Sequence, residues 1–139
     1  MYVFQQVEQI ALRDRRRLPP ADIKPESTRQ LQAYSGQYIL CASCQHLLSS
    51  RVPAISRQGT HEHTRINPAG VPFRFACFSQ LEDVLILGEA SHAHSWFLGY
   101  RWQYAMCRHC QQHLGWYFSS SSDCFYGLIL NRISIHAGH

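Results

Sequence analysis

The sequence contains little charge, a single lysine and no long apolar segment. Asp, Glu, Lys and Arg make up 16% of the 139 residues, against about 25% in typical soluble domains. No stretch approaches the roughly 18 consecutive apolar residues of a membrane-spanning helix. The N-terminus lacks a basic segment followed by an apolar core of about 7–15 residues, which argues against a secretory signal peptide. These absences predict a cytoplasmic protein with no membrane partner.

Positive charge is weak and is concentrated in one place. The 13 Lys and Arg residues exceed the nine Asp and Glu residues by only four, and the densest cluster is Arg13, Arg15, Arg16 and Arg17. A solvated helix end explains such a cluster better than the broad basic surface of a nucleic-acid-binding domain does. The sequence therefore predicts no nucleic-acid partner.

The chain divides into an extension and one domain. Residues 1–17 have apolar residues at helical spacing and predict a short amphipathic helix, which Pro19 and Pro20 end. A polar, proline-containing arm follows, so residues 1–36 are interpreted as an N-terminal extension. Residues 37–135 predict a mainly β domain, because β-branched and aromatic residues recur in short runs without long helical periodicity. The expected strands are 38–41, 71–78, 83–87, 97–106, 114–119 and 124–130.

Six cysteines are present, and four of them form two C-x-x-C pairs. The pairs are Cys41 with Cys44 and Cys107 with Cys110. Two thiolates at this spacing face one ion from a tight turn, and two such turns complete a tetrahedron without an open position. We therefore expect one structural Zn²⁺. The alternatives are disulfides and a thioredoxin-like redox motif, whose βαβ pattern is missing. Cys77 and Cys124 are interpreted as buried apolar residues.

All three tryptophans lie within residues 96–116, on either side of the second cysteine pair. Alternate residues of a strand share a face, so Trp102 and Trp116 are expected to stand side by side where the cysteine turn reverses the chain. Trp96 is expected to enter from the preceding loop. Core packing is the simpler explanation for rings of this size. The functional explanation is an aromatic box that binds a small flat or cationic group.

Motifs on both sides of the second cysteine pair form a specific combination. They are His94-Ser95-Trp96-Phe97-x-Gly99-Tyr100-x-Trp102, Cys107-x-x-Cys110, His113-x-Gly115-Trp116-x-Phe118, Asn67-Pro68-Ala69-Gly70, Phe73-Arg74-x-x-Cys77-Phe78 and Phe125-x-Gly127-Leu128. Together they resemble the CULT domain, the cereblon-type thalidomide-binding domain that also occurs as free-standing bacterial proteins. The resemblance covers about residues 37–133 and implies a free-standing bacterial single-domain member.

This resemblance implies a β-tent, in which two antiparallel sheets meet near the four-cysteine zinc site beside a shallow aromatic pocket. It also implies a set of ligand-binding residues with distinct places in that pocket. These are the walls Trp96, Trp102 and Trp116, the floor Phe118, the mouth residues Asn67 and Phe73, the residues His94 and Trp96 that hydrogen-bond a cyclic imide largely through their backbone, and Ser95 between them.

The function that the resemblance implies is non-enzymatic binding of a small ring. The ring is a cyclic imide, of the glutarimide or thalidomide type or at a protein C-terminus, or a uracil-like or uridine-like ring. The Lon-like domain and adaptor-binding region of cereblon have no counterpart here, so no ubiquitin-ligase adaptor is expected. One alternative is a cage for methylated ammonium groups, with Glu62 and Glu89 as the nearest carboxylates. A weaker alternative is a methionine sulfoxide reductase of the B type, with Cys124 as its nucleophile.

The histidines support only secondary hypotheses. His109 and His113 flank the second cysteine pair and are predicted to hydrogen-bond its thiolates. Isolated loop histidines are more often exposed or hydrogen-bonded than metal-bound. A second metal site is therefore not expected at His61, His63, His92 and His94.

Overall fold

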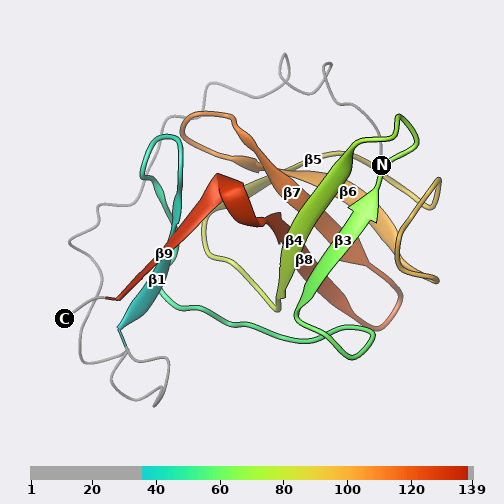
Figure 1. The fold of residues 1–139 in the computed structure, drawn as a ribbon, viewed down its shortest axis with the longest axis horizontal. Helices are drawn as coiled ribbons and strands as arrows, with labels where there is room; N and C mark the ends of the chain where they lie inside the picture. The colour runs from blue at the N-terminus through green and yellow to red at the C-terminus, as the bar shows by residue number, and fades with distance from the viewer. Residues whose placement is uncertain (1–35, 138–139) are drawn as a thin grey trace.

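Two antiparallel β-sheets make up residues 36–137, the part of the chain that the computed structural model describes (Figure 1). The smaller sheet consists, in spatial order, of β2 (Leu47–Ser49), β1 (Gln37–Cys41) and β9 (Ile133–Ala137). The larger sheet consists of β3 (Glu62–Ile66), β4 (Pro72–Phe78), β8 (Cys124–Ile129), β7 (His113–Ser119), β6 (Arg101–Cys107) and β5 (Val84–Ser91). The 3-10 helix η3 (Leu130–Arg132) connects β8 to β9. The predicted mainly β fold of two antiparallel sheets is confirmed.

The strands at the two ends of the described chain lie side by side. In Figure 1, β1 and β9 run antiparallel, and they pair from Gln37 with Ala137 to Cys41 with Ile133. The helix predicted over residues 1–17, and the arm that follows it, lie outside the described residues. Between residues 36 and 137 no helix is long and apolar enough to span a bilayer.

Three strands were not predicted, and one predicted strand is wrong in part. β2 has only three residues, while β3 and β9 each bury a single side chain, so none of them shows a clear apolar alternation. The expected strand 97–106 begins only at Arg101. Before it the chain turns: the Tyr100 amide donates to the Phe97 carbonyl at 3.0 Å, and Gly99 has a φ of 87°. Glycine reaches this left-handed region without steric cost, which ends the extended run.

The two faces of the larger sheet carry different side chains. Because alternate residues point to opposite faces, Phe78, Ala105 and Leu128 pack toward the smaller sheet, against Ile39 and Leu48. The opposite face carries aromatic rings, and Trp96, Phe97 and Tyr100 of the loop between β5 and β6 pack onto it. We call this set the aromatic cluster. Its members are Phe73, Phe75, Trp96, Phe97, Tyr100, Trp102, Tyr104, Trp116, Phe118 and Phe125.

The two cysteines outside the C-x-x-C pairs differ from each other. Cys77 in β4 is buried, as predicted, and this burial raises the pKa of its thiol to about 11. Cys124 is exposed, which corrects the prediction that it is buried. It is the first residue of β8 and pairs with Ser119, the last residue of β7, next to the turn that connects the two strands.

Candidate functional site

The two cysteine pairs form turns with the same backbone hydrogen bonds. In the first turn the Gln45 amide donates to the Cys41 carbonyl at 2.8 Å, and the Cys41 amide donates to the His46 carbonyl at 2.9 Å. In the second, the Gln111 amide donates to the Cys107 carbonyl at 2.9 Å. Gln45 and Gln111 occupy the same place after their cysteine pairs and have the same φ of 69°. The duplicated sequence motif is therefore a duplicated structure.

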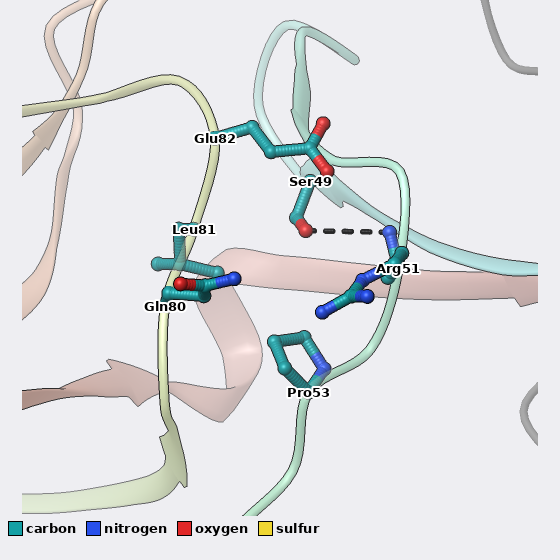
Figure 2. Close-up of a pocket in the computed structure, with 6 residues that line it drawn as sticks. All are labelled: Ser49, Arg51, Pro53, Gln80, Leu81 and Glu82. Carbon is teal, nitrogen blue, oxygen red and sulfur yellow. Dashed lines mark hydrogen bonds between the residues drawn. The ribbon is translucent and has the colours of Figure 1, made fainter. Parts of the chain in front are cut away.

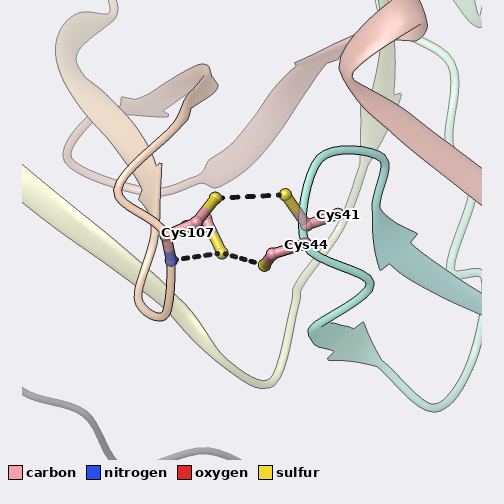
Figure 3. Close-up of side chains that lie close together, drawn as sticks. Cys41, Cys44 and Cys107 are labelled. Carbon is pink, nitrogen blue, oxygen red and sulfur yellow. Dashed lines mark hydrogen bonds between the residues drawn. The ribbon is translucent and has the colours of Figure 1, made fainter.

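Four sulfur atoms from these turns converge on one point. Cys41 Sγ lies 3.6 Å from Cys110 Sγ, and Cys44 Sγ lies 3.7 Å from Cys107 Sγ. Figure 3 shows Cys41 and Cys44 facing Cys107 across the gap between the turns. All four sulfurs lie within 4.8 Å of one another, and none forms a disulfide. A tetrahedral zinc ion with bonds of about 2.3 Å needs sulfurs about 3.8 Å apart. The cluster therefore fits one zinc ion, as predicted.

The thiols of the cluster differ in their pKa values. The hydrogen bond with Cys107 lowers the pKa of the Cys41 thiol to about 5. Burial raises the pKa of Cys44 to about 11, and the hydrogen bond with Cys41 raises the pKa of Cys107. A coordinated cation stabilises every thiolate, so loading the site releases protons. Such a site is structural, because four protein ligands leave no coordination position for a substrate.

The zinc site joins the two sheets. Cys41 is the last residue of β1 in the smaller sheet, and Cys107 is the last residue of β6 in the larger one. His46 and His109, one from each turn, stack with ring centroids 5.6 Å apart. Metal binding therefore contributes directly to the packing of one sheet against the other.

The histidines near the second cysteine pair have different surroundings. The Nδ1 atom of His109 is buried and has no hydrogen-bond partner in the described part of the chain. His113 donates from Nε2 to the Gly115 carbonyl at 2.9 Å, and its Nδ1 lies 3.4 Å from a guanidinium nitrogen of Arg132. Burial lowers the pKa of His113 to about 3, so its ring is neutral at physiological pH. The side-chain oxygen Oε1 of Gln112, which sequence reasoning did not single out, accepts from the Cys41 thiol at 3.6 Å.

Two of the tryptophans predicted to bind a ligand touch each other in the aromatic cluster. Trp96 and Trp116 meet edge to face with ring centroids 4.9 Å apart. Trp116 is only 1% exposed, whereas Trp96 is half-buried. Trp96 also stacks on Phe75 at 5.5 Å, with an angle of 12° between the rings. Phe73 meets Trp116 edge to face at 5.2 Å.

The third tryptophan occupies a diagonal position. Trp102 pairs with Phe118 across β6 and β7, while Tyr104 pairs with Trp116. Trp102 and Trp116 therefore share a face, and Tyr104 connects them through edge-to-face contact with Trp102 at 5.1 Å. The indole Nε1 of Trp102 donates to the Ala93 carbonyl at 2.7 Å, which ties the β5–β6 loop to the sheet.

The resemblance implies that three polar residues bind the ligand, and these residues lie in two turns. Asn67 is 5% exposed, and its Oδ1 accepts from the Val71 amide at 2.8 Å between β3 and β4. Ser95 accepts from the Phe97 amide at 3.3 Å through its hydroxyl oxygen. His94 is exposed and has a φ of 57°. These contacts fix the backbone on either side of Trp96 and at the β3–β4 hairpin.

A separate cavity lies away from the aromatic cluster. It encloses about 250 Å³, and its lining residues come from the end of β2 and the segments that follow β2 and β4 (Figure 2). Glu82, one of them, accepts hydrogen bonds from the Ser50 hydroxyl at 2.7 Å and the Ser50 amide at 3.1 Å. None of the residues predicted to bind a ligand lines it. The lining residues are Ser49, Arg51, Pro53, Gln80, Leu81 and Glu82.

Comparison with known proteins agrees with this geometry. The model of a family described as "Yippee zinc-binding/DNA-binding /Mis18, centromere assembly" matches residues 27–129. Protein cereblon is similar over a shorter stretch: 37% identity over 68 residues in Danio rerio, 35% over 68 in Gallus gallus and 40% over 53 in Drosophila persimilis. These alignments cover 45%, 45% and 34% of this chain, but only 16%, 15% and 9% of the relatives.

Proposed function

The chain belongs to the Yippee zinc-binding/DNA-binding and Mis18 family, and from that premise we propose that it is a non-enzymatic module that binds a small flat ring. The ring is a cyclic imide, such as glutarimide, thalidomide or a C-terminal cyclic imide of a protein, or a uracil-like ring. The partial similarity to cereblon and the cluster of aromatic rings with its tryptophans support this proposal.

One observation carries the proposal. The Nε1 atom of Trp116 is buried and has no hydrogen-bond partner among residues 36–137, and it lies beside the half-buried indole of Trp96. An unpaired buried donor costs about 1–3 kcal/mol. A ring with a C=O/N–H/C=O edge supplies carbonyl acceptors for such a donor, and its faces pack against indoles. A ring of this class therefore satisfies both features of the site.

The expected affinity is modest. Small ligands gain between about 0.3 and 1.5 kcal/mol per non-hydrogen atom, so a ring of about eight such atoms binds in the micromolar range at best. The test is a titration of the full chain with glutarimide, thalidomide and uridine, followed by tryptophan fluorescence and calorimetry. We expect saturable quenching for at least one ring and its loss in Trp96→Ala.

Tyr38→Ala provides the matched control, because Tyr38 stacks on His136 in the smaller sheet, outside the aromatic cluster. This variant should retain both zinc and ring binding. Absence of quenching by all three rings at millimolar concentration, in protein that retains its zinc, contradicts the proposal.

We propose no catalytic role for Cys124, although it is exposed. A reductase of methionine sulfoxide needs a thiolate activated by its surroundings. Turnover of methionine sulfoxide by the wild type and its loss in Cys124→Ser would establish the enzymatic alternative instead.

The proposal includes a small-molecule partner in the cytoplasm and no nucleic acid, membrane or ubiquitin-ligase adaptor. A site with four thiolates suits a reducing compartment. The family description names DNA binding, so the nucleic-acid part needs a direct test. Anisotropy of a labelled duplex at about 50 mM salt, where phosphate contacts are strong, should show no saturable binding. Saturable binding there would overturn this part.

A further inference from the structure

Three arginines surround the aromatic cluster. Each arginine–ring contact found between residues 36 and 137 involves a ring of this cluster. The distances from the guanidinium carbon to the ring centroid are 4.8 Å for Arg57 over Phe125, 5.8 Å for Arg65 over Phe97 and 5.9 Å for Arg132 over Phe73. The border of the cluster is therefore positively charged.

Only one of these charges is compensated by a carboxylate among the described residues. Arg57 donates to Asp123 at 2.8 Å. Arg65 instead donates to the side-chain oxygen of Gln58 at 2.9 Å and to the Thr64 carbonyl at 3.1 Å. Both acceptors are neutral, so they do not neutralise the positive charge of Arg65 beside the aromatic cluster.

Arg132 contacts neighbours of the buried Trp116. One of its terminal nitrogens donates to the His113 carbonyl at 3.0 Å and lies 3.4 Å from His113 Nδ1. The His113 ring meets Trp116 edge to face at 5.2 Å, and Phe73, beneath the Arg132 guanidinium, meets Trp116 at the same distance. Arg132 therefore contacts two of the rings that surround Trp116.

Of the two neighbouring side chains Arg132 and His113, only Arg132 is positively charged at neutral pH. Burial lowers the pKa of Arg132, but a guanidinium stays protonated at neutral pH. His113 is neutral there, for the reason given above. Both hydrogen bonds of Arg132 within residues 36–137 use one terminal nitrogen, so the other guanidinium N–H groups remain available for a ligand. A guanidinium presents such groups as a planar fork that matches two anionic oxygens.

We propose that the ring bound at this site carries an anionic group, a carboxylate or a phosphate, and that Arg132 selects it. This inference rests on the proposed function and narrows its ligand class. The ring packs on the tryptophans, while the anionic group points toward Arg132 and lies in the field of Arg65. The same charges repel a quaternary ammonium ion, which argues against the methylated-ammonium cage.

The experiment compares ligands that differ in one charged group. Uracil and orotate share the same imide edge, and orotate adds a carboxylate; uridine and uridine 5′-monophosphate differ by a phosphate. We expect at least one anionic ligand to bind about tenfold more tightly than its neutral counterpart at low ionic strength, with the ratio falling as salt rises. The pair that shows the larger ratio distinguishes a carboxylate from a phosphate.

Variants assign the preference to Arg132. Arg132→Gln should reduce the ratio to within about twofold, and Arg132→Lys, which keeps the charge but loses the fork, should retain part of it. Arg101→Gln is the control, since Arg101 is an exposed residue of β6 and its replacement lowers the net charge equally. It should leave the ratio unchanged.

The outcomes separate this inference from the proposed function. Equal binding of neutral and anionic ligands overturns the inference alone, as does a preference that survives in Arg132→Gln or disappears in Arg101→Gln. Tighter binding of tetramethylammonium than of uracil also overturns it. Absence of binding by every ring, neutral or anionic, removes the proposed function and the inference with it.

Discussion

Asp83 accepts a hydrogen bond from His46 Nε2 at 2.6 Å, and its other carboxylate oxygen accepts from Arg108 Nε at 3.0 Å. His46 follows the first cysteine pair, whereas Arg108 lies inside the second. Asp83 lies just before β5, outside both turns. A single carboxylate therefore links the two cysteine turns, independently of the metal that they hold.

We expect Asp83→Asn to loosen the zinc site. His46 is 5% exposed, so weakening its bond leaves a buried polar ring poorly paired, at a cost of about 1–3 kcal/mol in the free energy of unfolding. Residues that orient metal ligands change metal affinity about 10–100-fold. A colorimetric chelator should therefore extract zinc at least several-fold faster from the variant. Glu82→Gln is the control, since Glu82 bonds to Ser50 on the exposed surface. Equal extraction rates in Asp83→Asn and wild type would contradict this role.

Zinc itself should determine whether the sheets stay packed. Elemental analysis should give one zinc ion per chain, and Cys107→Ser should lose it because a tetrahedral site needs all four thiolates. Loss of the structural metal should reduce near-ultraviolet circular dichroism and the midpoint of thermal unfolding together. Cys124→Ser, outside the cluster, should keep the metal and the midpoint. A zinc-free Cys107→Ser protein with the wild-type midpoint would show that the metal is dispensable.

Local spacing explains why the zinc site could be predicted from the sequence. A C-x-x-C turn is complete within a few residues, and the predicted set of four cysteines is the set that the structure brings together. Alternation along β6 and β7 likewise placed Trp102 and Trp116 on one face. In each case the local geometry, a turn or a shared face, depends on neighbouring residues, whereas the approach of the two cysteine turns joins segments of different sheets.

Contacts between distant segments could not be predicted from local sequence patterns. Phe75 of β4 became the stacking partner of Trp96 only because the β5–β6 loop folds back over the sheet. Arg132 reaches the same cluster from η3, after β8. Neither residue lies in a local pattern that predicts the contact, since the strand order of the larger sheet is not encoded in any single segment.

Gly127 in β8 leaves room for two rings of the aromatic cluster. A Cβ atom added there would lie 2.8 Å from a carbon of the Phe75 ring and 3.2 Å from one of Phe118. Gly127→Ala should therefore displace the rings and destabilise the fold by about 1–3 kcal/mol, measured by urea unfolding. Gly88→Ala, with its nearest contact an ordinary 3.6 Å, tests the cost of alanine at a positive φ without a clash. A smaller loss in Gly127→Ala than in Gly88→Ala would contradict the packing argument.

Trp116→Phe should separate the indole N–H from the aromatic packing. The substitution keeps a buried ring but removes the Nε1 donor, which has no partner in the structure. We expect a stability loss of about 1–2 kcal/mol from the smaller ring and at least a tenfold loss of affinity for uracil-type ligands, since the ligand loses a buried hydrogen bond. Phe125→Leu is the control for packing alone, since Phe125 is a buried ring of the aromatic cluster outside the predicted ligand-binding set. An affinity unchanged in Trp116→Phe would show that the indole N–H does not reach the ligand.

His113 should make the fold sensitive to mild acid. Burial lowers its pKa from the usual 6.5 to about 3 in the folded protein, so between these values the unfolded chain takes up a proton that the folded one does not. The contribution of neutral His113 to the free energy of unfolding is complete above pH 6.5 and declines as the pH falls toward 3, by at most about 1.4 kcal/mol per pH unit.

The variant His113→Gln retains a donor for the Gly115 carbonyl but cannot titrate. Urea unfolding of both proteins from pH 7.5 to 4 should give a steeper decline for wild type, because protonation of the zinc ligands is common to both and cancels in the difference. Parallel declines would show that His113 does not titrate differently on unfolding.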